Sequence, residues 1–185
     1  EKITERRLEA KHNGEKGIAN VLKIVINSVF GKSNDKYSFL FDANVTYSVT
    51  LLGQLALMML IEKFHENGIK VISANTDGVI VHMDRRKGDL FKKAQNEWME
   101  LTKLSLEETE YKKYVRRDVN AYIALGVDGT IKKKGVFDVN IHKKADAPVV
   151  RNAMIKHFIE GIPVDETIKG EQDILEFAYY FRKRN

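Results

Sequence analysis

The stretch KVISANTDGVIVHM, residues 70–83, decides the fold that the sequence predicts. Residues 71–74 and 79–81 are β-branched or small, and the four residues between them, NTDG, are turn formers. Two such runs around Asn, Asp and Gly are typical of a β-hairpin, whose two strands are antiparallel. The stretch therefore predicts an antiparallel pair of strands with one carboxylate, Asp77, at its tip.

The rest of the chain reads as helices and further strands on both sides of this hairpin. Dense apolar repeats and charged amphipathic segments predict helices over about 1–33, 45–65 and 90–104. Strand-like alternation over 114–140, with a turn at Asp128-Gly129, predicts a second hairpin. Helices and hairpins in this order, with no strand–helix–strand rhythm, predict an α+β fold in which an antiparallel β-sheet packs with long helices.

Several predicted elements carry residues that commonly start or end a helix. Gly31 stands where the C-cap glycine of the first helix is expected, and Asn67-Gly68 is expected to end the second. The last part of the chain is expected to hold two helices, the second with Asp165 as its N-cap. A shift of composition near Pro148 predicts a boundary, and the parts we expect are 1–33, 34–147 and 148–185.

The composition indicates a folded, basic protein without cysteine. The 185 residues suffice for a buried core, and 43% of them are hydrophobic and 31% charged. The absence of cysteine excludes disulfides and thiolate metal sites and agrees with a cytoplasmic setting. A net charge of +5 permits a polyanionic partner. The apolar run 45–61 is predicted to be too mixed and too short to span a membrane, and no membrane partner is expected.

A polar stripe interrupts the otherwise apolar segment NVLKIVINSVFGK, residues 20–32. Lys23 and Asn27 lie four positions apart, on one side of a helix, and Phe30 and Gly31 fall on the same side one turn later. An ammonium suits a phosphate, a ring suits the face of a base, and glycine permits close approach of the backbone. The alternative is a half-exposed helix on which Lys23 is simply solvated.

Asp77 also allows two interpretations. Asx and Gly residues fill tight turns for conformational reasons alone, so Asp77 can be a turn former. Alternatively, the ends of two strands hold its carboxylate rigidly, where it can bind Mg²⁺ together with substrate phosphates. One acid rarely builds a catalytic metal site by itself.

Together, these two segments resemble motifs of the family B DNA polymerases. The spacing Lys23-x-x-x-Asn27-Ser28-x-Phe30-Gly31 looks like the family's fingers-helix motif, Lys-x-x-x-Asn-Ser-x-Tyr-Gly. The strand–NTDG–strand segment downstream looks like the palm motif, Asp-Thr-Asp-Ser or Asp-Thr-Asp-Gly.

Two further segments resemble the same family in the family's order. VTYSVTLLGQ, residues 45–54, is similar to the Thr-x-x-Gly-Arg helix. NAYIALGVDGTIKKKG, residues 120–135, is similar to the Lys-x-Tyr strand and the Lys-Gly turn. The resemblance covers about residues 5–140 and implies fingers in 1–33, part of the palm in 34–147 and the start of the helical thumb in 148–185.

The resemblance implies a role for each matched residue at the nucleotide. Lys23 would contact the triphosphate of the incoming dNTP and take part in catalysis, with Asn27 nearby. Phe30 would pack against the nascent base pair, beside Gly31. Asp77 would be catalytic as the ligand of Mg²⁺.

The second hairpin would bind the primer-template DNA. The residues expected there are Tyr122, Lys132, Lys134 and Gly135, and the pair Arg116-Arg117 also suits backbone phosphates. As an alternative, lysine runs of this kind are solvated strand edges that discourage aggregation.

The chain departs from the family motifs at four positions. Asn75 stands where the family has its first acid, Phe30 where it has Tyr, Gln54 where it has Arg, and Asn120 where the Lys-x-Tyr strand has Lys. In the family the second acid holds the metal, so Asn75 leaves that role to Asp77.

The sequence contains no Asp-x-x-Ser-Leu-Tyr-Pro segment, which supplies the family's other metal carboxylate. One acid cannot hold two metals for an in-line displacement. We therefore expect a fragment of a DNA polymerase, a nucleotidyltransferase, that is inactive without the remainder of the polymerase chain. The alternatives are a non-catalytic nucleic-acid-binding module derived from a polymerase palm and a basic α+β domain with a protein partner.

Overall fold

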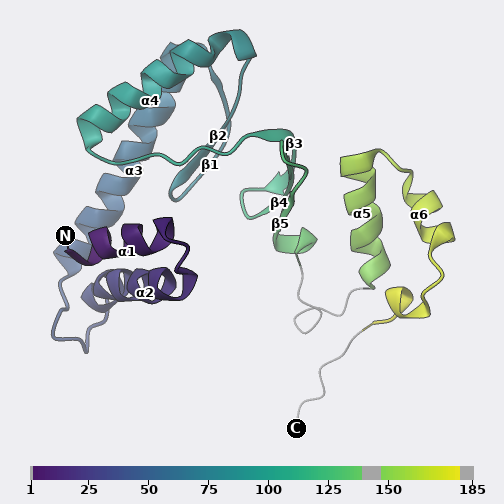
Figure 1. Ribbon diagram of the computed structural model, residues 1–185, viewed down its shortest axis with the longest axis horizontal. Coiled ribbons are helices and arrows are strands. Elements are labelled where there is room, and N and C mark those ends of the chain that lie inside the picture. The colour runs from purple at the N-terminus through teal and green to yellow at the C-terminus, as the bar shows by residue number, and fades with distance from the viewer. Residues whose placement is uncertain (1, 139–146, 180–185) are drawn as a thin grey trace. The chain divides into compact units, whose positions relative to one another are not determined.

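The computed structural model describes residues 2–138 and 147–179, in which α-helices combine with small sheets (Figure 1). The helices are α1 (Lys2–His12), α2 (Lys16–Ser33), α3 (Ala43–Glu66), α4 (Gly88–Thr102), α5 (Pro148–Glu160) and α6 (Val164–Gly170). The strands are β1 (Lys70–Asn75), β2 (Gly78–His82), β3 (Tyr111–Asp118), β4 (Ala121–Gly126) and β5 (Ile131–Lys134). Short 3₁₀ helices are η1 (Arg85–Lys87), η2 (Gly135–Phe137) and η3 (Ile174–Phe177). The predicted α+β class is confirmed.

The predicted hairpins are present, with one turn that the sequence pattern did not reveal. β1 and β2 form a two-stranded sheet, and β3, β4 and β5 form a three-stranded antiparallel sheet in that order. Asp128-Gly129 makes the predicted turn, with Gly129 at φ +85°. The additional turn, at 119–120, divides the predicted first strand into β3 and β4. The end of the predicted segment, 139–140, lies outside the described residues.

The prediction that Gly31 ends the first long helix is wrong. α2 continues to Ser33, and its C-cap is Asn34. The last turn persists because the Ser33 hydroxyl is buried and donates to the Phe30 carbonyl at 2.7 Å, and it also lies 3.0 Å from Thr46 Oγ1. A glycine in the right-handed conformation costs a helix only about 1 kcal/mol, which these contacts offset.

The prediction that Asp165 is an N-cap is also wrong. α6 begins at Val164, and the residue before it is Pro163. Asp165 therefore lies in the first turn, where its carboxylate accepts from Lys169 Nζ at 3.2 Å. The prediction for the second helix is correct, because α3 ends at Glu66 before Asn67 and Gly68.

Packing divides the chain into two compact units. Unit 1 comprises Glu1–Ile72 and Thr76–Lys103, and unit 2 comprises Ser73–Asn75 and Leu104–Asn185. Strand β1 therefore begins in unit 1, while its last three residues belong to unit 2. The expected functional division at 33/34 and 147/148 stays a prediction.

The core of unit 1 lies where α4 packs on the second half of α3. α4 buries Phe91, Ala94 and Trp98, which recur every three or four residues on one face of the helix. The Phe91 ring stacks on Phe64 of α3, with 5.2 Å between ring centroids. The Trp98 indole N–H donates to the Ala56 carbonyl at 2.7 Å. This hydrogen bond also fixes the position of α4 along α3.

Helix α2 and the first half of α3 expose many apolar side chains. Examples are Val21, Ile24, Val29, Leu51, Leu52 and Leu55, each more than half exposed. A helix that is apolar on nearly all sides is typical of a position buried in a larger structure. Exposed apolar area of this extent usually marks a surface that another molecule or segment covers.

α3 also corrects a prediction about the membrane. The 24-residue helix extends beyond the run 45–61 at both ends, and by length and average composition it could cross a bilayer. The prediction that the segment is too short is therefore wrong as to length. One such helix among the described residues is weak evidence for a membrane span, since core helices pass the same test.

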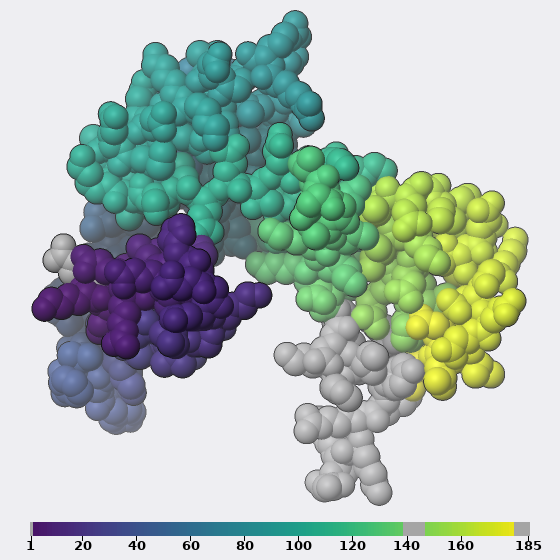
Figure 2. All heavy atoms as spheres, in the orientation of Figure 1, coloured from purple at the N-terminus to yellow at the C-terminus, as the bar shows by residue number. Residues whose placement is uncertain are grey.

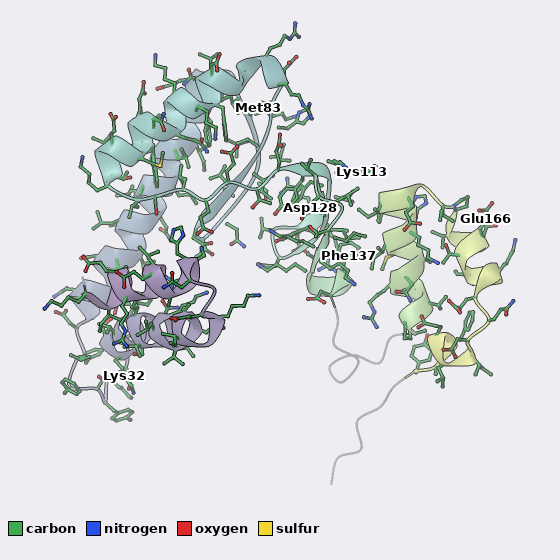
Figure 3. The ribbon with its side chains drawn as sticks, viewed as in Figure 1. Lys32, Met83, Lys113, Asp128, Phe137 and Glu166 are labelled. Atoms are coloured by element: carbon green, nitrogen blue, oxygen red, sulfur yellow. The ribbon has the colours of Figure 1, made fainter. Side chains whose placement is uncertain are left out.

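Unit 2 packs one face of its three-stranded sheet against α5. The buried centre is formed by Ile123 of β4, Phe137 of η2 and Ile159 of α5. Lys113 of β3 donates to the carbonyl of Ile159 at 2.7 Å and so ties the sheet to the end of α5. Figure 2 shows the green atoms of the sheet directly against the yellow-green atoms of α5, and Figure 3 labels Lys113 and Phe137.

We expect Trp98 to stabilise unit 1 both through the apolar packing of its ring and through its hydrogen bond. Trp98→Phe keeps most of the apolar contact but removes the bond to Ala56, so the free energy of unfolding should fall by about 1 kcal/mol. Trp98→Ala should lower it by about 3–5 kcal/mol, because it also leaves a cavity. Urea unfolding followed by circular dichroism measures both. Leu101→Ala, at a site 66% exposed, is the control, and a loss there equal to that of Trp98→Ala would contradict this account.

Candidate functional site: a hairpin acid and a basic sheet face

Asp77 lies at the exposed tip of the β1–β2 hairpin, directly after a strained residue. Thr76 has φ +39°, in the left-handed region that β-branched residues rarely adopt. Asn75 and Gly78, which tolerate that conformation better, lie in the strands on either side. If backbone preference alone determined the sequence of this turn, an asparagine or a glycine would occupy the left-handed position that Thr76 holds. Turn formation alone therefore does not explain the order of these residues.

The donor set at the tip does not by itself suit a two-metal centre. Asp77 is exposed, and residues 2–138 and 147–179 contain no group of three or more His, Asp or Glu side chains placed to hold a metal ion. A single carboxylate can contribute one ligand to Mg²⁺, which commonly takes one or two together with phosphate oxygens. The tip can thus contribute to a metal site but cannot complete one.

The predicted stripe on α2 is exposed as a whole. Lys23, Asn27, Phe30 and Gly31 are all exposed, and Phe30 is 43% accessible. No hydrogen bond or ion pair holds the Lys23 side chain within the described part of the chain, and none joins α2 to Asp77. The stripe is available to a ligand, but its exposure does not distinguish binding from simple solvation, since the apolar residues beside it are exposed too.

The three-stranded sheet brings predicted DNA-binding residues together. In the register of the sheet, Arg116 of β3 lies opposite Tyr122 of β4, and Tyr122 lies opposite Lys134 of β5. Directly opposed residues of antiparallel strands point to the same face. One cation from each outer strand thus flanks a central tyrosine.

The same face carries further aromatic residues and another lysine. We call it the tyrosine face and define it by Tyr111, Tyr114, Arg116, Tyr122, Lys132 and Lys134. The Tyr114 ring lies 5.3 Å from that of Tyr122 and 6.2 Å from that of Tyr111. Lys132 Nζ lies 5.5 Å from the centre of the Tyr111 ring and donates to its hydroxyl at 3.3 Å. Cations interleaved with aromatic rings are typical of a surface that binds nucleic acid.

Lys133 marks the difference between the two faces. It lies between Lys132 and Lys134 in β5 but opposite Ile123, on the face that packs toward α5. Alternation along a strand sends neighbouring side chains to opposite faces. Of the three consecutive lysines, Lys132 and Lys134 therefore lie on the same face as Tyr122, and Lys133 lies on the opposite face.

Gly135 has a structural reason for its place after Lys134. Its φ is +67°, and a Cβ built there would lie 2.4 Å from the carbonyl oxygen of Asn120 and 2.8 Å from Ala121. The backbone of β5 thus ends in close contact with the turn between β3 and β4. Gly135 therefore lets the end of β5 and the turn approach each other, and its expected contact with DNA stays a prediction.

The tyrosine face is partly covered by the end of β1. The side chain of Ser73, which is 8% exposed, lies close to the Tyr114 hydroxyl. Burial raises the pKa of Tyr114 above its ordinary value, and the nearby Ser73 side chain opposes this rise. Tyr114 is therefore a neutral, anchored ring, whereas Arg116, Lys132 and Lys134 remain exposed.

Sequence reasoning did not identify Tyr111 and Tyr114 as part of this surface. Strand alternation over 114–118 could have paired Tyr114 with Arg116, but two register shifts in β3 hide the full pattern. One shift lies between Tyr111 and Lys113, and it places residues three apart on one face. No sequence signal for that irregularity was evident.

Comparison with known proteins adds no family assignment, because the sequence matches no model of a protein family and no curated protein.

We expect Gly135→Ala to disrupt the junction of β5 with the β3–β4 turn. The substitution adds left-handed strain of about 1–2 kcal/mol and a backbone clash, so unit 2 should lose more than about 2 kcal/mol. Gly129→Ala is the matched control, because Gly129 also has positive φ but a Cβ there meets nothing within 4 Å. Amide hydrogen exchange across β4 and β5 measures both. Equal losses in the two variants would show that φ alone matters at Gly135.

Proposed function

We propose that this chain is part of a family B DNA polymerase, comprising a fingers helix, the second half of the palm and the start of the thumb. The observation that supports this most is the row Arg116–Tyr122–Lys134 across three strands. Tyr122 and Lys134 match two different motifs of the family, the Lys-x-Tyr strand and the Lys-Gly turn. Their placement as cross-strand partners is what a shared role at the primer strand requires.

The reaction of the parent polymerase would be nucleotidyl transfer. The primer 3′-oxygen attacks the α-phosphorus of the dNTP, the new oxygen–phosphorus bond forms, and the bond to the bridging oxygen breaks to release pyrophosphate. Positioning and electrostatics supply most of the rate in such transfers. Lys23 would neutralise triphosphate charge, Asn27 and Phe30 would line the nucleotide, and Arg116, Lys132 and Lys134 would hold backbone phosphates.

Mg²⁺ is the metal that the proposed reaction requires, and Asp77 is the residue that would contribute a ligand. The described residues contain no group of three or more His, Asp or Glu side chains placed to hold a metal ion, and the sequence lacks the segment that supplies the family's other metal carboxylate. We therefore propose that the chain alone is catalytically inactive. The missing carboxylate would come from the remainder of the polymerase chain.

The exposed apolar residues of α2 and α3 support the proposal of such a partner. They are numerous for a domain that works alone, and α3 carries no charged side chain from Ala43 to Ile61. The hydroxyl of Thr50 donates to the Thr46 carbonyl at 2.9 Å, so this polar group is satisfied within the helix and can be buried without an outside partner.

A second candidate function is a nucleic-acid-binding module without catalysis. The tyrosine face favours it, since that surface needs no metal and no nucleotide. The two candidates differ at Asp77 and Lys23, which only the polymerase requires.

We expect Asp77→Asn to abolish primer extension by the full-length protein that contains this segment. Loss of a metal-binding carboxylate should lower kcat by about 10³-fold or more. The assay uses a primed DNA template with dNTPs and Mg²⁺. Asp89→Asn, at an exposed acid in the first turn of α4, is the control and should leave kcat unchanged. If Asp77→Asn extends primers as well as wild type, Asp77 is a turn former and the metal role fails.

The tyrosine face predicts a specific pattern of DNA affinity in the 185-residue chain. Substituting Lys132 and Lys134 by Ala should lower the slope of log K against log salt by about 0.9 for each phosphate that the protein no longer neutralises. Lys133→Ala removes the same charge from the other face and should leave the slope unchanged. Fluorescence anisotropy with primed duplex DNA between low and moderate salt measures it. Equal effects of all three lysines would indicate diffuse attraction and no defined surface.

A further inference from the structure

Two side-chain contacts join the end of β1 to the sheet of unit 2. The side chain of Ser73 lies close to the Tyr114 hydroxyl, and Asn75 Nδ2 donates to Asn120 Oδ1 at 3.3 Å. Ser73 and Asn75 are two positions apart, so they lie on one face of the strand. That face of β1 is therefore held at β3 and at the β3–β4 turn.

Contacts within unit 2, other than the one with Asn75, hold the backbone of Asn120 in place. Its backbone N–H donates to Asp118 Oδ1 at 2.9 Å, and Arg117 bonds the other carboxylate oxygen at 2.8 Å. These contacts hold the pKa of Asp118 below its ordinary value, so the carboxylate stays ionised. On the other side, Gly135 packs against the Asn120 carbonyl. The hydrogen bond from Asn75 therefore goes to a residue, Asn120, whose backbone other contacts hold in place.

Both members of this contact are departures from the polymerase motifs. Asn75 replaces the first acid of the palm motif, and Asn120 replaces the lysine two positions before the tyrosine. In this fold the two positions are within hydrogen-bond distance. An acid and a lysine placed there would form an ion pair, and two carboxamides form a neutral bond in the same place.

We propose that the Asn75–Asn120 pair is a neutral clasp that stands in for an acid–lysine pair, and that Asn75 is a positioning residue for Asp77. This rests on the proposed function, in which Asp77 is a metal ligand. A single residue, Thr76, with a left-handed φ of +39°, separates Asn75 from Asp77, so a shift of Asn75 has only one residue between it and the carboxylate. The clasp fixes the start of that short connection without adding a second negative charge next to it.

The two substitutions should therefore be interdependent in the full-length protein. Asn75→Ala and Asn120→Ala should each lower kcat for primer extension by about tenfold, and the double variant should lose no more than either one. The KM for dNTP should change less than kcat, because the proposed direct nucleotide contacts, Lys23, Asn27 and Phe30, are unaltered. Asn152→Ala removes an amide bonded to Glu176 and is the matched control, expected to change neither quantity. Losses that multiply in the double variant would overturn the clasp.

Exchange of the neutral pair for a charged pair gives a second, independent test. Asn75→Asp combined with Asn120→Lys should restore kcat to within about threefold of wild type, because the ion pair spans the same gap. Asn75→Ala combined with Asn120→Lys should stay low, since the lysine then has no partner. If the variant that combines Asn75→Asp with Asn120→Lys is no more active than the variant that combines Asn75→Ala with Asn120→Lys, the proposal that the neutral pair replaces an ion pair is wrong.

The 185-residue chain separates failure of the clasp from failure of the polymerase proposal. In its NMR spectrum, Asn120→Ala should shift the side-chain amide of Asn75, and Asn152→Ala should not. Titration with Mn²⁺ should broaden the Gly78 amide, and the midpoint should rise about threefold or more in Asn75→Ala and Asn120→Ala. An unmoved Asn75 resonance overturns the clasp, and an unmoved midpoint overturns the positioning role. If every full-length form fails to extend primers, the proposed function fails, and these two spectra still decide the clasp.

Discussion

The close approach of Gly135 to the β3–β4 turn is the constraint on which the rest of unit 2 depends. Because residue 135 has no side chain, β5 ends against Asn120 and Ala121, and the register that opposes Lys134 to Tyr122 is kept to the last pair. The chain then enters η2, which delivers Phe137 into the core with Ile123 and Ile159. One glycine thus links the exposed row of cations to the buried cluster beneath it. The tyrosine face and the buried cluster thus belong to the same three strands and to the 3₁₀ helix that follows them.

Helix lengths, the two Asp- or Asn-containing hairpins and the α+β class follow from local sequence, since each rests on periodicity or on turn chemistry. The failures have tertiary causes. Gly31 does not end α2 because Ser33 is held by Thr46 of another helix, and the turn at 119–120 lacks the glycine that marked the other hairpin. Tyr122 and Lys134 are predicted from their resemblance to two motifs, and their pairing on one face is a finding of the structure. Tyr111 could not be placed by counting alternate residues, because the irregularity in β3 breaks the count.

The two units differ in how completely each buries its own apolar side chains. In unit 2 the sheet, η2 and α5 bury a shared centre, and the other side of the sheet carries exposed cations and half-buried tyrosines. In unit 1 the second half of α3 is packed by α4, whereas the first half and most of α2 expose apolar side chains. Hydrophobic burial is the main favourable term in folding, so apolar helices without cover are incomplete as a folding unit. The exposed apolar side chains of unit 1 thus favour a covering partner without reference to any motif.

The choice between a polymerase part and a binding module depends on the hairpin tip, because the tyrosine face serves both. If the tip were only a turn, its residues would follow conformational preference, and the left-handed position would hold Asn or Gly. The chain has both residues in NTDG and yet places Thr76 at φ +39°. Strain of this kind costs about 1–3 kcal/mol and persists where something else determines the geometry. The clasp at Asn75 fixes one side of that residue, and the carboxylate of Asp77 lies on the other. A turn former gains nothing from this strain, whereas a carboxylate that must meet a metal and two phosphate-bearing substrates gains a defined position.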